Sequence, residues 1–464
     1  MNIPLKKDIR PVLVYAAVLM LLFLGCSPKL TNVALPIDDL QEFRYTGTEV
    51  LEEKWWTAFE DEQLNSMIDS AMRSNFDLAA TWQQFRAAKA VVVREAGIKW
   101  PQIETSAQTA LNFPENDFRG GENTQLGLSA SYEVDLWGRI RTAVQAEKFR
   151  ADASLYDYQT AAISLSAEIA TAWYQLLAAK KQLKITDTQI TTNENIIKLI
   201  RSRFVGGQIR AVDILRQVQL LESTKEQRII FTTDVQLLEN RLAVLLGRQP
   251  QNRLETDSNE LPELPALPQA GLPLELVRRR PDLQQSYALL LAADRDMASA
   301  VRNRYPRLEL TARGQLRANN FANLFDNWAY SLAGNILGPL FYGRQLSAEA
   351  DRNEAIKQQR LYAYGQTTLE AFEEVENGLI QDQMQKERVE NIGRQLELAE
   401  KSNQQLRIEF LNGFSPYLDV LIGLDGEQQL QRDYVTAQSE QIQIRIALYR
   451  SLAGGFETER TLEN

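Results

Sequence analysis

The sequence predicts a mixed α/β membrane protein that combines long antiparallel coiled-coil helices with four short β-strands. Three observations lead to this fold class. The chain contains one pattern twice, each copy has segments in which apolar and polar residues alternate, and each copy then runs for 70 residues without proline, over 138–207 and 343–412. The alternating segments have the length that crosses a membrane as tilted strands. A helix of 70 residues would extend about 105 Å, several times the thickness of a bilayer core.

The composition excludes several classes of function. The chain has 464 residues, a formal net charge of -10, no histidine and one cysteine. Without a basic surplus, the chain has no means of neutralising the phosphates of a nucleic acid. Without histidine, it has no Ser-His-Asp or Cys-His catalysis and no HExxH zinc site. We therefore expect no enzyme, no metal site, no cofactor other than a covalent lipid, and no nucleic-acid partner.

The first 25 residues read as a lipoprotein signal peptide. Three cations precede an apolar run of 14 residues over 11–24, and Gly25 and Cys26 follow it. The run is shorter than the roughly 20 residues of a spanning helix. Cleavage before Cys26 would leave this residue as the lipidated N-terminus, and Ser27 in place of an aspartate favours the outer membrane. The alternative is a plain membrane anchor with an incidental cysteine.

A tandem duplication organises the rest of the chain. Equivalent motifs recur in the same order at an offset of 205 or 206 residues, which predicts a first repeat over 26–247 and a second over 274–455. A proline-rich linker over 248–273 separates them, and a tail covers 456–464. The matched motifs are Asn75–Leu78 with Arg280–Leu283, Trp100-Pro101 with Tyr305-Pro306, Trp137–Arg139 with Tyr342–Arg344, Phe204–Gly207 with Phe410–Gly413, and Asp213 with Asp419.

Each repeat is expected to contain two strands, near 102–113 and 124–136 in the first and near 307–317 and 328–340 in the second. From Leu126 to Leu136 every even position is apolar except for the small Ala130, and polar or small residues intervene. This period of two is typical of a strand with one buried face. An ordinary soluble hairpin with one wet face would give the same alternation.

The proline-free stretches are expected to form long helices with coiled-coil seams. Gly206-Gly207 and Asn412-Gly413 would end these helices, and second helices would return to Gly247 and Gly454, which makes two antiparallel hairpins. A generic coiled coil is the alternative. The seam residues step by three and four: Leu183, Thr186, Ile190, Asn193, Ile197, Ile200 and Phe204, then Val389, Ile392, Leu396, Ala399, Asn403, Leu406 and Phe410.

The strand count requires more than one subunit. Four strands cannot close a barrel, for which about 8 is the minimum, and open edges are not tolerated in lipid. Pooled strands would form one barrel, and the long helices would continue it as a tube into the periplasm. The expected architecture is a duct.

With these features the sequence resembles the TolC family, in the lipoprotein branch that serves resistance-nodulation-division efflux pumps. The resemblance covers the whole mature chain. It implies a homotrimer with a 12-stranded transmembrane β-barrel and a 12-helix periplasmic α-barrel, fed by an inner-membrane transporter through a periplasmic adaptor, with no chemistry of its own. The motifs that carry it are Trp55-Trp56 with Phe59, Asp61 and Leu64; Asn75–Leu78; Tyr132–Gly138; Gly271–Pro273 with Arg279–Leu283; and Gly413 with Leu418–Leu421.

Two other functions stay open at this point. A type I protein secretion outlet would share the architecture, and a structural periplasm-spanning lipoprotein would share Cys26 and the long helices. Neighbouring genes for an adaptor and a resistance-nodulation-division transporter would distinguish an efflux channel from a secretion outlet. Channel conductance would distinguish it from a structural lipoprotein. Trp55 and Trp56 are expected in the core rather than at a ligand. The sequence does not identify the exported substrate.

The candidate sites lie where the long helices end. Docking of the adaptor is expected at the hairpin tips, formed by Gly206, Gly207, Arg210, Asp213, Asn412 and Gly413. In the resembling family acidic residues narrow the closed tunnel just beyond this point, where this chain has Asp419, with Ile422 in the place of a second acid. Both would share one helix face at i, i+3. The alternative is that Ser415 is the N-cap, Pro416 the first helical residue and Asp419 a partner of the helix dipole.

Overall fold

The computed structural model describes residues 43–46, 52–112, 121–250, 260–270, 273–318 and 321–462. The signal peptide and Cys26 lie outside these ranges. The chain divides into two compact units. Within the described ranges, the first unit contains residues 92–147 and 291–361, and the second unit contains all the others.

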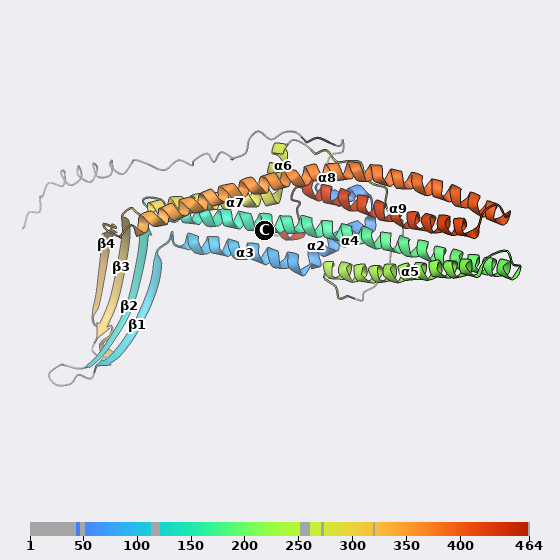
Figure 1. Ribbon diagram of the computed structural model, residues 1–464. Helices are drawn as coiled ribbons and strands as arrows, with labels where there is room; N and C mark the ends of the chain where they lie inside the picture. The colour runs from blue at the N-terminus through green and yellow to red at the C-terminus, as the bar shows by residue number, and fades with distance from the viewer. Residues whose placement is uncertain are drawn as a thin grey trace, which may run out of the picture. The chain divides into compact units, whose positions relative to one another are not determined.

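The first unit contains one antiparallel sheet of four strands. They are β1 (Gln102–Asn112), β2 (Gly121–Val134), β3 (Arg307–Ala318) and β4 (Trp328–Leu337), paired in the order β1-β2-β3-β4 (Figure 1). All four predicted strands are present. β4 ends earlier than predicted because Gly338 and Pro339 follow it, and proline has no N–H for the ladder.

The sheet has one apolar and one polar face, because residues paired directly across the strands lie on the same side. Rows such as Leu126, Leu316 and Trp328 form the apolar face, and rows such as Ser129, Arg313 and Ser331 form the polar face. On β4, the aromatic and aliphatic residues of the apolar face are exposed: Trp328, Tyr330, Leu332 and Ile336.

Helix ends support this sheet within the first unit. They belong to α3 (Phe76–Gly97), α4 (Arg139–Val205), α7 (Pro281–Arg302) and α8 (Gln345–Leu411), and a short helix η2 (Phe321–Asn323) lies between β3 and β4. Trp137 Nε1 donates to the Pro306 carbonyl at 2.8 Å. Lys357 and Asp294 form an almost buried ion pair at 2.7 Å between α8 and α7.

The second unit is helical. It contains η1 (Trp55–Phe59), α2 (Glu62–Ser74), most of α4 and α8, the returning helices α5 (Ala211–Leu245) and α9 (Tyr417–Leu452), and the short helices α6 (Pro273–Arg279) and α10 (Glu459–Leu462). α4 turns back into α5, and α8 into α9 (Figure 1). α4 and α8 have 67 residues each, which at 1.5 Å per residue is about 100 Å. The two predicted hairpins are therefore present.

A large aromatic cluster forms the core of the second unit. Trp55 and Trp56 are fully buried, as expected for core residues. Trp55 Nε1 donates to Ser166 Oγ at 3.1 Å, and the ring of Trp56 packs edge-on against Phe456 at 5.1 Å. Trp173 Nε1 donates to the Asp61 carboxylate, which also caps the start of α2.

The coiled-coil seams are present but are not quite those expected. On α4 the buried stripe includes Thr186, Asn193, Ile197 and Ile200, together with Gln182, Gln189 and Ile196, while Leu183 and Ile190 are half-buried. Phe204 is 44% exposed, so its placement in the seam was wrong. It lies in the last turn of α4, where the chain is already bending into the tip. On α8 Asn403 of the predicted seam is buried, and the other six predicted residues are half-buried: Val389, Ile392, Leu396, Ala399, Leu406 and Phe410.

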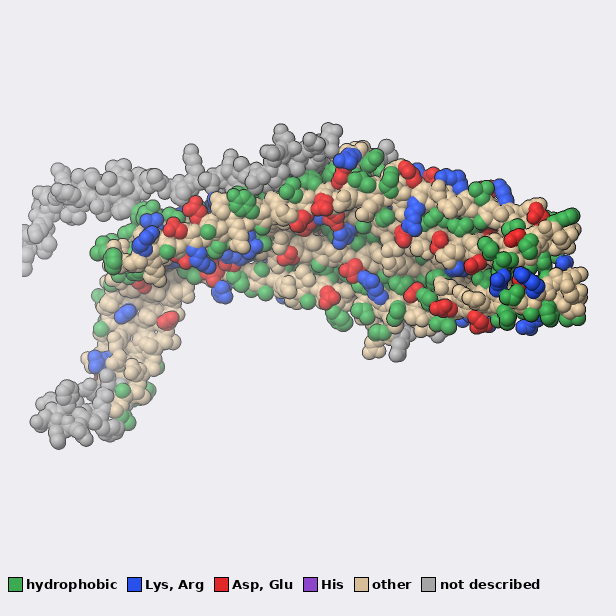
Figure 2. All heavy atoms as spheres, in the orientation of Figure 1, with side chains coloured by type: hydrophobic (Ala, Val, Ile, Leu, Met, Phe, Trp, Pro, Cys, Tyr) green, Lys and Arg blue, Asp and Glu red, His purple; other side chains and the backbone are tan. Residues whose placement is uncertain are grey.

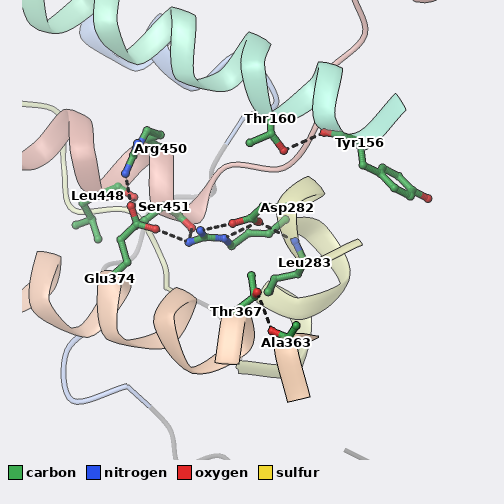
Figure 3. A network of polar contacts seen from close by, with 11 residues as sticks. Tyr156, Thr160, Asp282, Leu283, Ala363, Thr367, Glu374, Leu448, Arg450 and Ser451 are labelled. Carbon is green, nitrogen blue, oxygen red and sulfur yellow. Dashed lines mark hydrogen bonds and ion pairs between the residues drawn. The ribbon is translucent and has the colours of Figure 1, made fainter. Parts of the chain in front are cut away.

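Ion pairs join the helices of the second repeat, and one of them is buried. Arg445 of α9 binds Asp382 of α8 with two hydrogen bonds of 2.8 Å and also contacts the Pro265 carbonyl. In a second network Glu374 lies between Arg450 and Arg280, and Arg280 also binds Asp282 (Figure 3).

None of the described helices is long and apolar enough to cross a membrane.

Candidate functional site

The two hairpin tips share one local geometry. Gly207 and Gly413 follow the ends of α4 and α8 with φ of +69° and +80°, a conformation that side chains with a Cβ rarely adopt. Gln208 N donates to the Arg203 carbonyl and Phe414 N to the Glu409 carbonyl, which is the hydrogen-bond pattern of a Schellman motif. A Cβ at either glycine would meet nothing within 4 Å. The glycines are therefore required by the backbone turn and not by close packing. Gly206 and Asn412 precede them in the same turns.

In the first hairpin, Arg210 and Asp213 bind each other at the start of α5. The Arg210 guanidinium donates to both carboxylate oxygens of Asp213 at 3.1 and 3.0 Å, and Arg210 N donates to Oδ2 at 3.3 Å. The hydrogen bond to Asp213 raises the pKa of Arg210. Asp213 is only 4% exposed, whereas the Arg210 side chain is mostly exposed. Asp213 is therefore a structural residue of the tip.

The start of α9 differs in detail from the sequence expectation. The N-cap is Pro416 and the helix begins at Tyr417, one residue later than expected. Ser415 therefore does not cap the helix, and its hydroxyl donates instead to Asp419 Oδ2 at 3.1 Å. Proline fits before the helix because it has no N–H to satisfy there. Asp419 lies in the first turn of α9, where a negative charge is favourable.

The first turns of α9 have one buried and one exposed face. Tyr417, Val420 and Leu424 pack against Ile196 and Ile200 of α4 in a hydrophobic cluster at the tips. Asp419 and Ile422 are exposed, and Ile422 keeps 63% of its surface accessible. The two candidate gate residues thus share a face that no described residue covers.

A buried layer of hydrogen bonds lies behind this exposed face. Asn193 of α4 donates to Thr224 of α5 at 3.1 Å and to Gln428 of α9 at 3.2 Å. Its carbonyl oxygen accepts from Gln217 and from Gln428. Asn193 therefore uses its full hydrogen-bonding capacity and joins three helices.

Tyr417 extends this polar layer to the first residue of α9. Its hydroxyl donates to Gln217 Oε1 at 2.5 Å. Burial, together with the charge of Asp213, raises the pKa of Tyr417, so the hydroxyl stays protonated and remains a donor. The sequence indicated Asn193 as a polar seam residue, but Gln217, Tyr417 and Gln428 carried no such signal because their partners are distant in sequence.

The predicted site residues thus fall into three groups. Gly206, Gly207, Asn412 and Gly413 form the turns, Arg210 and Asp213 pair with each other, and Asp419 and Ile422 lie on an exposed face. In the described ranges no group of three or more cysteine, aspartate or glutamate residues could hold a metal ion. The arrangement offers turns, caps and an exposed helix face, without a set of groups arranged for chemistry.

A membrane-length sheet with one apolar and one polar face, in a chain that also has two helical hairpins whose longer helices measure about 100 Å, defines an outer-membrane channel protein that extends into the periplasm. The chain belongs to the outer membrane efflux protein family, whose model matches residues 67–248 and 272–454.

Characterised relatives include export proteins of pseudomonads. The chain is 29% identical over 430 residues to the pyoverdine export outer membrane protein OpmQ of Pseudomonas aeruginosa, covering 88% of each chain. It is 26% identical over 426 residues to the solvent efflux pump outer membrane protein SrpC of Pseudomonas putida, covering 87% of each.

Solved structures share the fold over almost the whole chain. The outer-membrane channel OprN is 26% identical, with a TM-score of 0.82 over 93% of this chain and 99% of that one. The open state of the Neisseria gonorrhoeae MtrE outer membrane channel has a TM-score of 0.84 at 21% identity, over 94% of this chain and 99% of that one.

Proposed function

We propose that three copies of this chain form the outer membrane channel of a tripartite efflux system. Each copy would supply four strands to a 12-stranded transmembrane β-barrel and two hairpins to a periplasmic α-barrel. The channel would be a passive path, with the energy for export supplied by an inner-membrane transporter. The observation that carries the proposal is the two-faced sheet of a member of the outer membrane efflux protein family.

The unpaired edges of the sheet support a barrel that is built from the strands of several subunits. β1 and β4 are the outer strands of the described sheet, and each has a partner on one side only. Unpaired backbone groups are not tolerated in lipid, so the strands of several subunits must close a barrel. Because β1 and β4 run in opposite directions, β4 of one copy can pair antiparallel with β1 of the next, which keeps the same pairing around the ring.

The helices also carry apolar stripes that have no partner within the described part of one chain. On α5, Ile230, Leu237 and Val244 follow each other at intervals of seven and are 44%, 60% and 58% exposed. On α8, Tyr362 and Leu369 are seven residues apart and are also exposed. A spacing of seven is typical of helix seams, so these stripes fit contacts between neighbouring subunits.

The proposed partners follow from the family and its relatives. A periplasmic adaptor protein would bind the hairpin tips, at Gly206, Gly207, Arg210, Asn412 and Gly413, with the buried Asp213 holding Arg210 in position. A resistance-nodulation-division transporter of the inner membrane would supply the substrate and the energy. Relatives are named for the export of pyoverdine and of solvents. Small molecules are therefore the proposed cargo of this channel, ahead of the proteins that a type I secretion outlet would carry.

Lipidation of Cys26 is a further part of the proposal. The lipid would hold the chain at the outer membrane, after removal of residues 1–25, and is the only covalent group that we propose. The repeat boundaries 26–247 and 274–455, with a linker over 248–273 and a tail over 456–464, belong to the same proposal. Each repeat then supplies two strands and one long hairpin.

Two neighbouring residues of β4 allow a matched test of the channel. Leu332 lies on the apolar face and Ser331 on the polar face, and both are exposed. We expect Leu332→Arg to lose assembly, because an arginine facing lipid at mid-membrane costs about 2–4 kcal/mol per strand. Ser331→Arg should assemble and lower the conductance, because its side chain would enter the lumen.

The measurements are the mass of the detergent-solubilised protein, corrected for detergent, and single-channel conductance in a planar bilayer. The unchanged protein should have a mass near three subunits and conduct ions. A monomer, or a lack of conductance with all strands intact, would contradict the proposal. If Leu332→Arg and Ser331→Arg do not differ in mass or conductance, the assignment of Leu332 to the lipid-facing side and Ser331 to the lumen is contradicted.

A further inference from the structure

Four connecting segments join helices to strands at one end of the sheet. They are 98–101 before β1, 135–138 after β2, 303–306 before β3 and 338–344 after β4. They share this end because neighbouring strands are antiparallel, so that Gln102 lies opposite Ser131 and Arg307 opposite Leu337. We call them the junction segments.

Each junction segment exposes large apolar side chains. Leu340 and Phe341 are 101% and 90% exposed, and they lie three and four residues after the end of β4. Figure 2 shows hydrophobic side chains gathered where the strands meet the helices, with basic side chains beside them. The other exposed members are Ile98, Trp100, Leu136, Tyr305 and Tyr342. Aromatic residues at such a position are typical of the boundary between lipid and water.

Basic residues accompany the aromatic ones in a repeated pattern. Lys99-Trp100-Pro101 in the first repeat corresponds to Arg304-Tyr305-Pro306 in the second, and Arg344 follows Phe341 and Tyr342. Lys99, Arg304 and Arg344 are all exposed. Arg344 also has a φ of +69°, which is uncommon for a residue other than glycine. Its backbone conformation is therefore held by its surroundings.

Two acidic residues of the same end, Glu133 and Asp135, are already engaged within the protein. Glu133 binds Arg139 at 2.8 Å. Asp135 accepts from the backbone of Ile140 and Arg141 and pairs with the Arg141 side chain at 3.4 Å. For Lys99, Arg304 and Arg344, by contrast, the described part of the chain supplies no carboxylate within ion-pair distance. The junction segments thus combine exposed aromatic residues with cations that are available to an anion.

We propose that the junction segments bind the phosphate groups of anionic phospholipids, with Lys99, Arg304 and Arg344 as the binding residues. Leu340 and Phe341 insert beside the acyl chains, and the cations reach the headgroups at the same depth. The occupant is a membrane and not a protein, because the segments adjoin a sheet whose apolar face would contact lipid in the proposed barrel. This inference rests on the proposed barrel, which places that side of the sheet in the bilayer.

The test compares two lipids on the reconstituted channel. The channel is placed in phosphatidylcholine bilayers that contain traces of spin-labelled phosphatidylglycerol or spin-labelled phosphatidylcholine, and the immobilised fraction of each label is measured. We expect a several-fold preference for phosphatidylglycerol. The variant Lys99→Gln/Arg304→Gln/Arg344→Gln should lose this preference while its single-channel conductance remains.

A control variant removes the same number of positive charges at positions outside the junction segments. Lys198, Arg201 and Arg394 are exposed on the long helices, so Lys198→Gln/Arg201→Gln/Arg394→Gln should keep the preference. If the first variant does not assemble, the unchanged channel still gives an answer. Its preference should fall when the salt concentration is raised from about 0.01 M to about 1 M, because the Debye length shrinks from about 30 Å to about 3 Å.

The proposal is overturned if the unchanged channel does not distinguish the two lipids, if both triple variants lose the preference equally, or if the preference resists salt. Failure of the proposed channel function would be seen separately, as a loss of conductance in the unchanged protein.

Discussion

At the scale of single residues, the tip of the second hairpin separates structural from exposed positions. Tyr417 is buried and donates to Gln217, and Asn193 is saturated with hydrogen bonds. Asp419 has one partner, the hydroxyl of Ser415, and remains exposed on the same face as Ile422. In the proposed trimer we expect this face to narrow the tunnel, with one acidic residue and one apolar residue from each subunit.

We expect Asp419→Ala to raise the resting single-channel conductance and to weaken block by multivalent cations added from the periplasmic side. The reason is the loss of a carboxylate that would bind such cations in a ring. Ile422→Ala should raise the conductance but keep the cation block. Glu400→Ala is the control, because Glu400 is also an exposed acidic residue but lies on α8, about three turns before the end of that helix. Unchanged conductance and block in Asp419→Ala, with lower thermal stability, would assign Asp419 to the helix terminus alone.

At the scale of elements, two ion pairs of the long helices are expected to contribute very different free energies to stability. Arg445 and Asp382 join α9 to α8 with side chains that are each 7% exposed. Lys401 and Glu397 pair along the surface of α8 with side chains that are 67% and 63% exposed. An exposed pair contributes little because water screens it, whereas a buried charge that loses its partner is strongly unfavourable.

We therefore expect Asp382→Asn to destabilise the protein by about 3–5 kcal/mol, because the Arg445 guanidinium would remain buried without a counter-charge. Glu397→Gln should leave the unfolding temperature almost unchanged, because water already screens this exposed pair. Thermal unfolding of the solubilised protein, followed by circular dichroism, measures both variants side by side. Equal unfolding temperatures would show that the α8–α9 contact does not depend on this ion pair.

At the scale of the whole molecule, one succession of elements occurs twice. The order α3, β1, β2, α4, α5 recurs as α7, β3, β4, α8, α9. Equivalent positions nevertheless have different surroundings. Asp213 and Asp419 correspond in the repeat, but Asp213 is buried beside Arg210 whereas Asp419 is exposed beside Ser415. The duplication thus supplies two similar hairpins whose tips differ in the burial and partners of equivalent residues.

The proposed anchor also belongs to this scale, because it decides which membrane holds the whole chain. We expect the mature protein to begin at an acylated Cys26, because Gly25-Cys26 ends an apolar run too short to span a bilayer. Mass spectrometry of the N-terminal peptide checks this. Cys26→Ser should retain residues 1–25, and Lys54→Ser, which changes an exposed residue of the described chain, should be processed normally. A mature wild-type protein that still carries residues 1–25 would refute the anchor.

The sequence by itself determined the elements of this protein. The four strands and two long hairpins could be predicted because their signals are local: alternation with a period of two, a lack of proline over 70 residues, and glycines at the helix ends. Gly207 and Gly413 were found at the tips for the same reason, since a left-handed residue after a helix is a local requirement. Trp55 and Trp56 were assigned to the core correctly from their residue type.

Only the tertiary structure decided how these elements face one another. It buried Asp213 and exposed Asp419, left Phe204 outside the seam, and joined Asn193, Gln217 and Gln428 across three helices. Gln217 and Gln428 lie 24 and 235 residues from Asn193, so no local pattern could pair them. The rotation of a helix about its axis depends on the sum of many packing contacts with distant segments, and periodicity alone does not fix it to within one residue.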